Sequence, residues 1–142
     1  MGRTRVRDIM QRKIVTVSAG DRLSTAEDIM TLGGVRHLPV VQRGELVGVL
    51  DERDLLRISL SNLNRAGQPE RRAFLHAVEI ARAMTEPPTV IDSEAPVEIA
   101  AAVMAENDLG CLPVVEKDGE LVGLITETDL LLHLSRGTAG HA

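Results

Sequence analysis

The hydrophobic and polar positions of the chain follow one pattern twice. When residues 6–58 are aligned with residues 80–133, the apolar stretch LPVV coincides in both copies, and so does GELVG after one inserted residue near Asp118. An internal duplication of this kind dictates the architecture, and two copies are too few for a solenoid. The alignment therefore predicts two similar halves arranged as a pseudo-twofold pair, with sites in the groove between them.

Each copy has the spacing of a β-α-β-β-α unit. β-branched residues at 14–17 and at 89–91 predict a short first strand. Small and apolar residues then recur at helical spacing, and two apolar strands joined by a short turn follow. A last helix is predicted to begin near Asp51 in the first copy and near Thr126 in the second. We expect the first helix to join parallel strands and the last two strands to be antiparallel.

The duplication also sets the expected domain boundaries, which are repeat 1 at 1–58, a helical connecting segment at 59–79, repeat 2 at 80–134 and a flexible tail at 135–142. In the connecting segment, Pro69 predicts the start of a helix whose apolar face carries Phe74, Leu75 and Val78. In one interpretation this helix packs on the protein or on a dimer partner. In the other it is an arm that recognises a different protein.

Composition narrows the possible functions. The chain has 142 residues, 44% of them hydrophobic and 26% charged, which is typical of a globular protein. Its net charge of -5 argues against a general polyanion binder, and Phe74 is the only aromatic residue, so the stacking platform of single-strand nucleic-acid binders is missing. The sequence has no apolar run that predicts a membrane span and no signal-peptide pattern, so we expect a cytoplasmic protein that binds neither membranes nor nucleic acid.

The sequence lacks the motifs of the common catalytic and metal sites. It contains no Walker loop, no G-x-G-x-x-G and no G-x-S-x-G elbow. Its four histidines, His37, His76, His133 and His141, are scattered without metal-ligand spacing. Cys111 is the single cysteine and is expected to fill apolar space. We therefore expect no metal, no catalytic cofactor and no enzymatic activity.

The duplicated β-α-β-β-α pattern, the twin LPVV stretches and GLITETD resemble a pair of CBS domains, also called a Bateman module, over nearly the whole chain. The resemblance implies an α+β fold in which two repeats pack with pseudo-twofold symmetry and are joined by a helical insert. The family's third strand reads Gly, an apolar residue, any residue, Ser or Thr, two further residues, and Asp. Copy two fits with Gly123, Leu124, Thr126 and Asp129, whereas copy one has Gly48, Val49 and Asp54 but carries Asp51 at the Ser/Thr position.

The resemblance implies a binding site for an adenosine derivative in the second copy. Asp129 would bind the ribose hydroxyls, Thr126 the phosphate or ribose, and Thr128 a phosphate. A carboxylate can accept hydrogen bonds from both hydroxyls of a cis-diol, and the start of a helix suits a phosphate. The adenine is expected against an apolar group of residues: Thr89, Val90, Ile91, Leu112 and Pro113. In related modules basic residues just before LPV reach the phosphate, which implies that role for Arg36 or His37.

Asp51 makes the two copies unequal. A carboxylate beside a phosphate costs on the order of 1 kcal/mol in a partly screened groove, although Arg53 can offset its charge. We therefore expect a degenerate second site around Asp51, Arg53, Asp54, Thr16, Val17 and Pro39, either empty or holding an uncharged or cationic group. Asp51-x-x-Asp54 and Thr126-x-x-Asp129 also fit plain helix capping, which spacing alone favours. The duplication and the family resemblance favour a ligand role for Asp129.

Taken together, these features predict a stand-alone regulatory module that senses cellular energy charge by binding AMP, ADP or ATP. The resemblance implies a homodimer, and any regulated target is a separate, unknown protein. Two alternatives remain. One is a ligand-free interaction or dimerisation scaffold that acts through the helix around Phe74. The other is the same fold with S-adenosylmethionine or a cyclic dinucleotide as its ligand.

Overall fold

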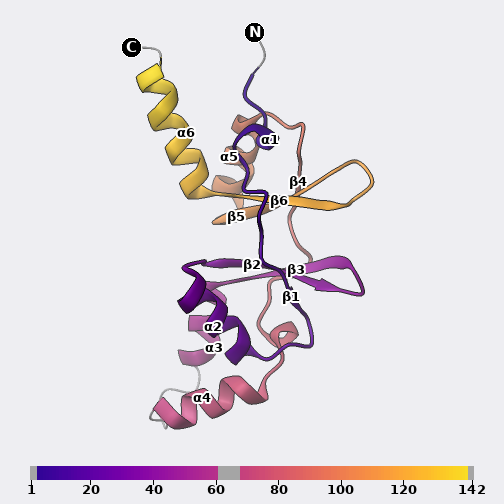
Figure 1. The fold of residues 1–142 in the computed structure, drawn as a ribbon, viewed down its shortest axis with the longest axis vertical. Coiled ribbons are helices and arrows are strands. Elements are labelled where there is room, and N and C mark those ends of the chain that lie inside the picture. The colour runs from indigo at the N-terminus through magenta and orange to yellow at the C-terminus, as the bar shows by residue number, and fades with distance from the viewer. Residues whose placement is uncertain (1–2, 61–67, 141–142) are drawn as a thin grey trace. The chain divides into compact units, whose positions relative to one another are not determined.

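The computed structural model describes residues 3–60 and 68–140 and divides into two compact units, which we describe separately. Unit 1 consists of Met1–Ile14 and Thr89–Ala142, and unit 2 of Val15–Pro88. Each unit holds a three-stranded sheet flanked by helices, with the strand order β4-β5-β6 in unit 1 and β1-β2-β3 in unit 2 (Figure 1). The predicted α+β class is confirmed.

Unit 2 contains the elements predicted for the first copy. Helix α2 (Leu23–Gly33) connects β1 (Val17–Ser18) to β2 (His37–Gln42), which turns into β3 (Glu45–Asp51) and then α3 (Glu52–Leu60). Strand β1 pairs with β2 in parallel, and β2 pairs with β3 antiparallel, as the pattern predicts. The last strand therefore feeds directly into the helix that begins beside Asp51.

Unit 1 repeats this arrangement with the second copy. Its elements are β4 (Ile91–Asp92), α5 (Val97–Asn107), β5 (Cys111–Val115), β6 (Leu121–Thr126) and α6 (Glu127–Gly140). The pairing is again parallel between β4 and β5 and antiparallel between β5 and β6. Helix α6 runs through residues 135–140, which the sequence places in the tail, and residues 141–142 lie outside the described range.

The first strand of each copy is shorter and lies later than predicted. The β-branched stretches at 14–17 and 89–91 predicted strands there, but β1 covers Val17–Ser18 and β4 covers Ile91–Asp92. A strand needs a neighbour to accept and donate its backbone hydrogen bonds, and pairing with β2 and β5 begins only at Val17 and Ile91. β-propensity alone does not reveal where that partner begins.

The segment that begins each copy packs in the unit formed by the rest of the other copy. The N-terminal segment with helix α1 (Val6–Ile9) belongs to unit 1, where Gln11 and Leu124 form an antiparallel bridge. The segment with the short 3₁₀ helix η2 (Ile80–Arg82) belongs to unit 2, where Thr85 bridges Val49. The two repeats have therefore exchanged equivalent edge segments.

Close packing against glycine holds these exchanged segments in place. A Cβ atom on Gly123 would lie 2.6 Å from the Met10 sulfur and 2.8 Å from the Gln11 carbonyl oxygen. A Cβ atom on Gly48 would lie 2.8 Å from the Met84 sulfur and 2.9 Å from a backbone oxygen. Contacts this short are forbidden to real side chains, so the glycine of each GELVG stretch makes room for the exchanged segment.

Each unit has its own hydrophobic core. The core of unit 1 lies between the sheet and helices α1 and α5, and it contains Val6, Met10, Ile91, Ala100, Met104, Leu112, Val114 and Ile125. The core of unit 2 is larger because it includes Leu75 of the connecting segment and Ile80 at the start of repeat 2, both fully buried. The described part of the connecting segment that follows Gln68 thus belongs to unit 2.

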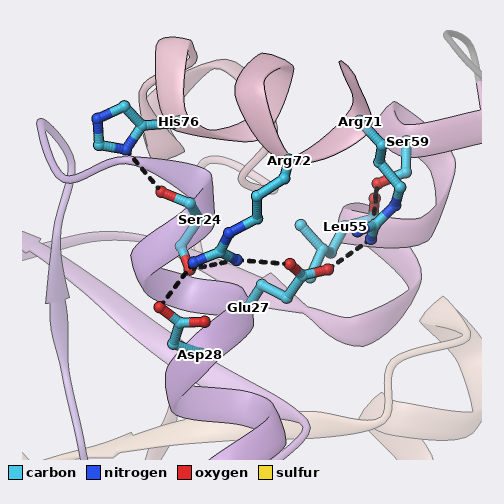
Figure 2. A network of polar contacts seen from close by, with 8 residues as sticks. All are labelled: Ser24, Glu27, Asp28, Leu55, Ser59, Arg71, Arg72 and His76. Atoms are coloured by element: carbon cyan, nitrogen blue, oxygen red, sulfur yellow. Dashed lines mark hydrogen bonds and ion pairs between the residues drawn. The ribbon is translucent and has the colours of Figure 1, made fainter. Parts of the chain in front are cut away.

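Helix α4 (Gln68–Ala77) of that segment packs on α2, and ion pairs line the contact. Arg71 donates to Glu27 at 2.5 Å, and Arg72 donates to Glu27 at 2.7 Å and to Asp28 at 2.8 Å (Figure 2). Burial by itself raises the pKa of Glu27, but the hydrogen bonds from the two arginines outweigh burial and hold that pKa below its ordinary value. The interpretation in which this helix packs on the protein itself is confirmed.

Candidate ligand site

The predicted ligand residues of unit 1 gather at one end of its sheet. Strand β6 ends at Thr126, which pairs with Cys111, the first residue of β5, and α6 begins at the next residue. Because β4 runs parallel to β5, the residues that precede β4, 89–90, approach the same end. The start of a helix, the end of a strand and an exposed extended segment therefore meet there.

Asp129 and Thr126 form a reciprocal capping box at the start of α6. Oδ2 of Asp129 accepts hydrogen bonds from the Thr126 backbone N–H at 2.8 Å and from its hydroxyl at 3.0 Å. The Asp129 backbone N–H in turn donates to the Thr126 hydroxyl oxygen at 3.2 Å. The capping role allowed by the spacing is thus present, and it engages Oδ2 more than Oδ1.

A side chain that the sequence analysis did not single out reaches the same carboxylate. Nε2 of Gln11 lies 3.3 Å from Oδ1 and 3.2 Å from Oδ2 of Asp129. Gln11 comes from the exchanged N-terminal segment and is exposed. Gln11 aligns with Thr85, directly after the matched Met10 and Met84. The alignment of the two copies therefore gives these two residues equivalent positions and could have identified Gln11.

The apolar residues predicted to surround an adenine differ in accessibility. Thr89 is exposed, and Val90 has 41% of its surface exposed. Ile91 and Leu112 belong to the core of unit 1, with 8% and 0% of their surface exposed, so their side chains pack inward. Pro113 is fully buried and alternates with Leu112 and Val114, which places it on the other face of the sheet.

The residues predicted to bind phosphate lie in both units. Thr128 is exposed in the first turn of α6, where the helix has its positive end. Arg36 is exposed and His37 is the first residue of β2, and both belong to unit 2. The role of Arg36 or His37 toward a ligand held by Asp129 stays a prediction.

In unit 2 the equivalent helix start is capped by two carboxylates. The Asp51 backbone N–H donates to Oδ2 of Asp54 at 3.0 Å, and the Asp54 backbone N–H donates to Oδ1 of Asp51 at 2.8 Å. Two cations partly balance this pair, since Arg53 lies 3.4 Å from Asp51 and Arg57 lies 3.2 Å from Asp54. The Thr85 hydroxyl donates to Asp54 at 3.3 and 3.4 Å, as Gln11 does to Asp129.

The surroundings of Asp54 are less favourable to a negative charge than those of an exposed acid. Its side chain is only 5% exposed, and burial raises its pKa above the ordinary value. The negative charge of Asp51 raises this pKa further, while hydrogen bonds from the Asp51 backbone and Thr85 and the charge of Arg57 lower it. The remaining residues predicted for this site are the exposed Thr16, the core residue Val17 and the buried Pro39.

Comparison with known proteins places the chain in a family. The model of the CBS domain family matches residues 6–61 and 78–136, and the chain belongs to this family as a CBS domain pair. A CBS domain-containing protein of Dictyostelium discoideum is 30% identical over 89% of this chain and 88% of its own length. In a Methanocaldococcus jannaschii relative the match spans 46% of the protein, and in a Korarchaeum cryptofilum inosine-5'-monophosphate dehydrogenase it spans 23%.

Solved CBS structures share the fold. CBSX2, crystallised in complex with AMP, is 25% identical with a TM-score of 0.77, and the match covers 94% of this chain and 98% of that one. The CBS pair of protein MJ0100, crystallised with 5-methylthioadenosine and S-adenosyl-L-methionine, has the same TM-score of 0.77 at 24% identity and covers 99% of this chain. At that identity the second likeness concerns the fold alone.

The described residues form neither a membrane span nor a metal-binding cluster. Among residues 3–60 and 68–140, no helix is long and apolar enough to cross a bilayer. Within the same ranges, no three His, Cys, Asp or Glu side chains are grouped so that they could hold a metal ion.

Proposed function

We propose that this CBS pair is a regulatory module that senses adenosine nucleotides, with one functional binding site per chain, at Asp129. The ligand would be AMP, ADP or ATP, and its binding would alter how the protein engages a separate target. The observation that carries this proposal is the half-buried Asp129 carboxylate, held at a strand-to-helix junction with one oxygen, Oδ1, engaged only by an exposed side chain among the described residues.

The geometry of the junction suits a ribose phosphate. A cis-diol can donate to both oxygens of one carboxylate, which fixes the orientation of the ribose as well as adding affinity. The first turn of α6 offers the positive end of a fourteen-residue helix, and Thr128 is exposed there to donate to a phosphate. The 41% exposed Val90 supplies apolar surface for a base at the same end of the sheet.

The contrast with unit 2 supports a single site. There the acid at the Ser/Thr position, Asp51, carries a negative charge where unit 1 has a hydroxyl, and Asp54 is 5% exposed and already bound by Arg57 and Thr85. A phosphate at that junction would be repelled by the negative charge of Asp51 and Asp54 that the nearby arginines do not balance. S-adenosylmethionine, whose sulfonium is cationic, is the ligand that this second junction would tolerate best.

The surface helices support a homodimer. Leu131 and Leu134 on α6 are 65% and 63% exposed, and Leu56 and Leu60 on α3 are 57% and 51% exposed. The two leucines of α6 are three residues apart and those of α3 are four apart, so each pair shares one helix face and forms exposed apolar surface for a partner to cover. A second copy of the chain is the partner we propose, and sedimentation of the wild type against a Leu131→Glu, Leu134→Glu variant tests it.

The experiment that tests the ligand is a thermal-shift and calorimetry panel. It contains AMP, ADP, ATP, NADH, S-adenosylmethionine and a cyclic dinucleotide, measured on the wild type, Asp129→Ala and, as the matched control in unit 2, Asp54→Ala. A ligand at a hundredfold excess over its Kd adds about 2.7 kcal/mol to the free energy of unfolding. We expect one adenosine nucleotide per chain, lost in Asp129→Ala and retained in Asp54→Ala.

The same panel separates the sensor from the scaffold. The ligand-free scaffold would be favoured if no ligand gives a thermal shift or a binding heat, and if Asp129→Ala lowers the free energy of unfolding only by the capping energy of about 1 kcal/mol. Equal occupancy of two sites by AMP would refute the single-site proposal. A signal with S-adenosylmethionine that depends on Asp54 would move the function to unit 2.

A further inference from the structure

The carboxylate that would hold the ribose is already engaged by a side chain from another part of the chain. Nε2 of Gln11 lies within 3.3 Å of both oxygens of Asp129, including Oδ1, the oxygen that the capping box leaves to a diol. A carboxylate offers about four lone-pair positions, and the Thr126 backbone and hydroxyl already use two on Oδ2. Gln11 thus occupies the acceptor capacity that the cap leaves over.

The backbone of Gln11 is fixed, so only its side chain can move away. Its N–H donates to the Leu124 carbonyl at 2.8 Å, and its carbonyl accepts from the Leu124 N–H at 2.9 Å. The preceding Met10 is 9% exposed and packs over Gly123. Withdrawal of the whole segment would break this packing and the β-bridge, whereas rotation of an exposed amide into water breaks only the contact with Asp129.

The Gln11 contact has the properties of an easily displaced bond. Its distances of 3.2 and 3.3 Å lie at or beyond the long end of the normal N–H···O range, and both oxygens share one NH₂ group. The Thr126 backbone contact at 2.8 Å is shorter and local to the cap. A ligand would therefore displace Gln11 and leave the capping box intact.

We propose that Gln11 is a built-in competitor for Asp129 that must swing away before a ribose diol binds, and that it thereby sets the affinity of the site. This inference rests on the proposed function, because it assumes that Asp129 binds the diol. It also links the ligand to the exchanged N-terminal segment, since occupancy of the site releases a side-chain contact between that segment and α6.

The test uses Gln11→Met, which keeps the length of the side chain and removes the amide donor. AMP is the probe, measured by calorimetry and stopped-flow mixing, with 2'-deoxyadenosine 5'-monophosphate as the second ligand. The loss of one weak competing hydrogen bond should lower the Kd for AMP about fivefold. Gln11→Ala should change the Kd in the same direction, which separates loss of the amide from any effect of the methionine.

The two ligands distinguish competition from a structural role. The deoxy ligand presents a single ribose hydroxyl and competes with Gln11 for one acceptor position of Asp129 instead of two, so its affinity should gain less from Gln11→Met than that of AMP. A merely structural change would shift both affinities alike. The matched control is Thr85→Val, which removes the equivalent donor in unit 2 and should leave the AMP affinity at Asp129 within twofold.

Each outcome has a separate meaning. A wild type that binds AMP, with an unchanged or weaker affinity in Gln11→Met, overturns the competition and leaves the proposed function standing. A wild type that shows no binding while Gln11→Met binds AMP supports a strong competitor. If the wild type and both Gln11 variants all fail to bind AMP, the AMP site itself is refuted and the competitor falls with it.

Discussion

In unit 1 the helix that follows the third strand, α6, begins at a Thr–Asp capping box, and in unit 2 the equivalent helix, α3, begins at an Asp–Asp box. The backbone hydrogen bonds of the two boxes are nearly the same, at 2.8 Å to Asp129 and 3.0 Å to Asp54. Their electrostatics differ, because Thr126 adds a donor to Asp129 whereas Asp51 adds a second negative charge beside Asp54. Capping therefore survives the exchange of Thr for Asp, while the charge at the junction and its capacity to accept an anion are expected to change.

The first helices of the two units differ as well. Glu27 and Asp28 on α2 bind the arginines of α4, and the aligned positions on α5 are Ala101 and Ala102. Alanine side chains form no ion pairs, so the ion pairs that hold α4 on α2 have no equivalent at these positions of α5. Unit 2 thus combines ion pairs over α2 with a charge-crowded start of α3, and the described residues of unit 1 show neither feature at α5 or α6.

The feature that the two units share is the glycine under the exchanged segment, and removing it should have the largest effect. In Gly123→Ala the new methyl group would meet the Gln11 carbonyl oxygen at 2.8 Å, and backbone cannot yield as a flexible side chain does. Forced overpacking of this kind costs about 2–3 kcal/mol. We expect that loss in the free energy of unfolding in urea, and a similar loss for Gly48→Ala.

Gly137→Ala is the matched control for these two variants, because a Cβ at Gly137 on α6 meets nothing within 4 Å. Alanine in an open helical position should be neutral or stabilise by up to about 1 kcal/mol. A stability within about 0.5 kcal/mol of the wild type for both Gly48→Ala and Gly123→Ala would show that the exchanged segments are not tightly held.

The ion-pair cover of unit 2 should contribute less, and its contribution should depend on pH. In Glu27→Gln the two arginines lose their carboxylate, and charge-assisted hydrogen bonds of this partly exposed kind are worth about 1.5 kcal/mol together. Since the pKa of Glu27 is held below 4.5 in the folded protein, its stabilisation is present above pH 4.5 and is lost as pH falls through that lower pKa. Urea unfolding at pH 7 and at low pH should show the difference shrinking.

The control for this effect is Glu106→Gln on α5, an exposed glutamate of the unit that has no such helix cover. It should change stability by no more than about 0.5 kcal/mol at pH 7. A Glu27→Gln loss that persists unchanged in acid would mean that packing of the side chain, and not its charge, holds α4 on α2.

The sequence predicted the repeated elements well because each has its own local signal. The apolar residues of LPVV and GELVG and the Gly33-Gly34 pair place β2, β3 and the end of α2 correctly, and Gly34 adopts the left-handed conformation with φ 65°. The ion pairs on α2 were beyond prediction, because Arg71 and Glu27 are far apart in sequence and no pattern ties them together.

The exchange of edge segments was hidden for a different reason. Met10 and Met84 are aligned and identical, so either segment would fill the space over either glycine with the same contacts. The sequence therefore predicts that a methionine packs over each glycine, but it does not predict which methionine packs over which glycine. The same ambiguity concealed Gln11, whose meaning depends on lying beside Asp129 and not beside Asp54.

The most direct probe of the difference between the two helix starts is Asp51→Thr, with the smallest expected effect on stability. Burial raises the pKa of Asp54, and the charge of Asp51 raises it further, so the stability linked to its protonated form is present below pH 3.8 and is lost as pH rises through the raised pKa. Removing Asp51 lowers the pKa of Asp54, and the new hydroxyl can donate as Thr126 does to Asp129. The variant should therefore exceed the wild type by about 1 kcal/mol at pH 7, converge with it in acid, and gain a second, weaker AMP site per chain. Urea unfolding across pH, NMR titration of Asp54 and calorimetry measure these three effects.

Thr126→Asp is the reverse control, and it should lose stability as pH rises and bind no AMP. Parallel stability curves for Asp51→Thr and the wild type would mean that Arg53 and Arg57 already neutralise the pair.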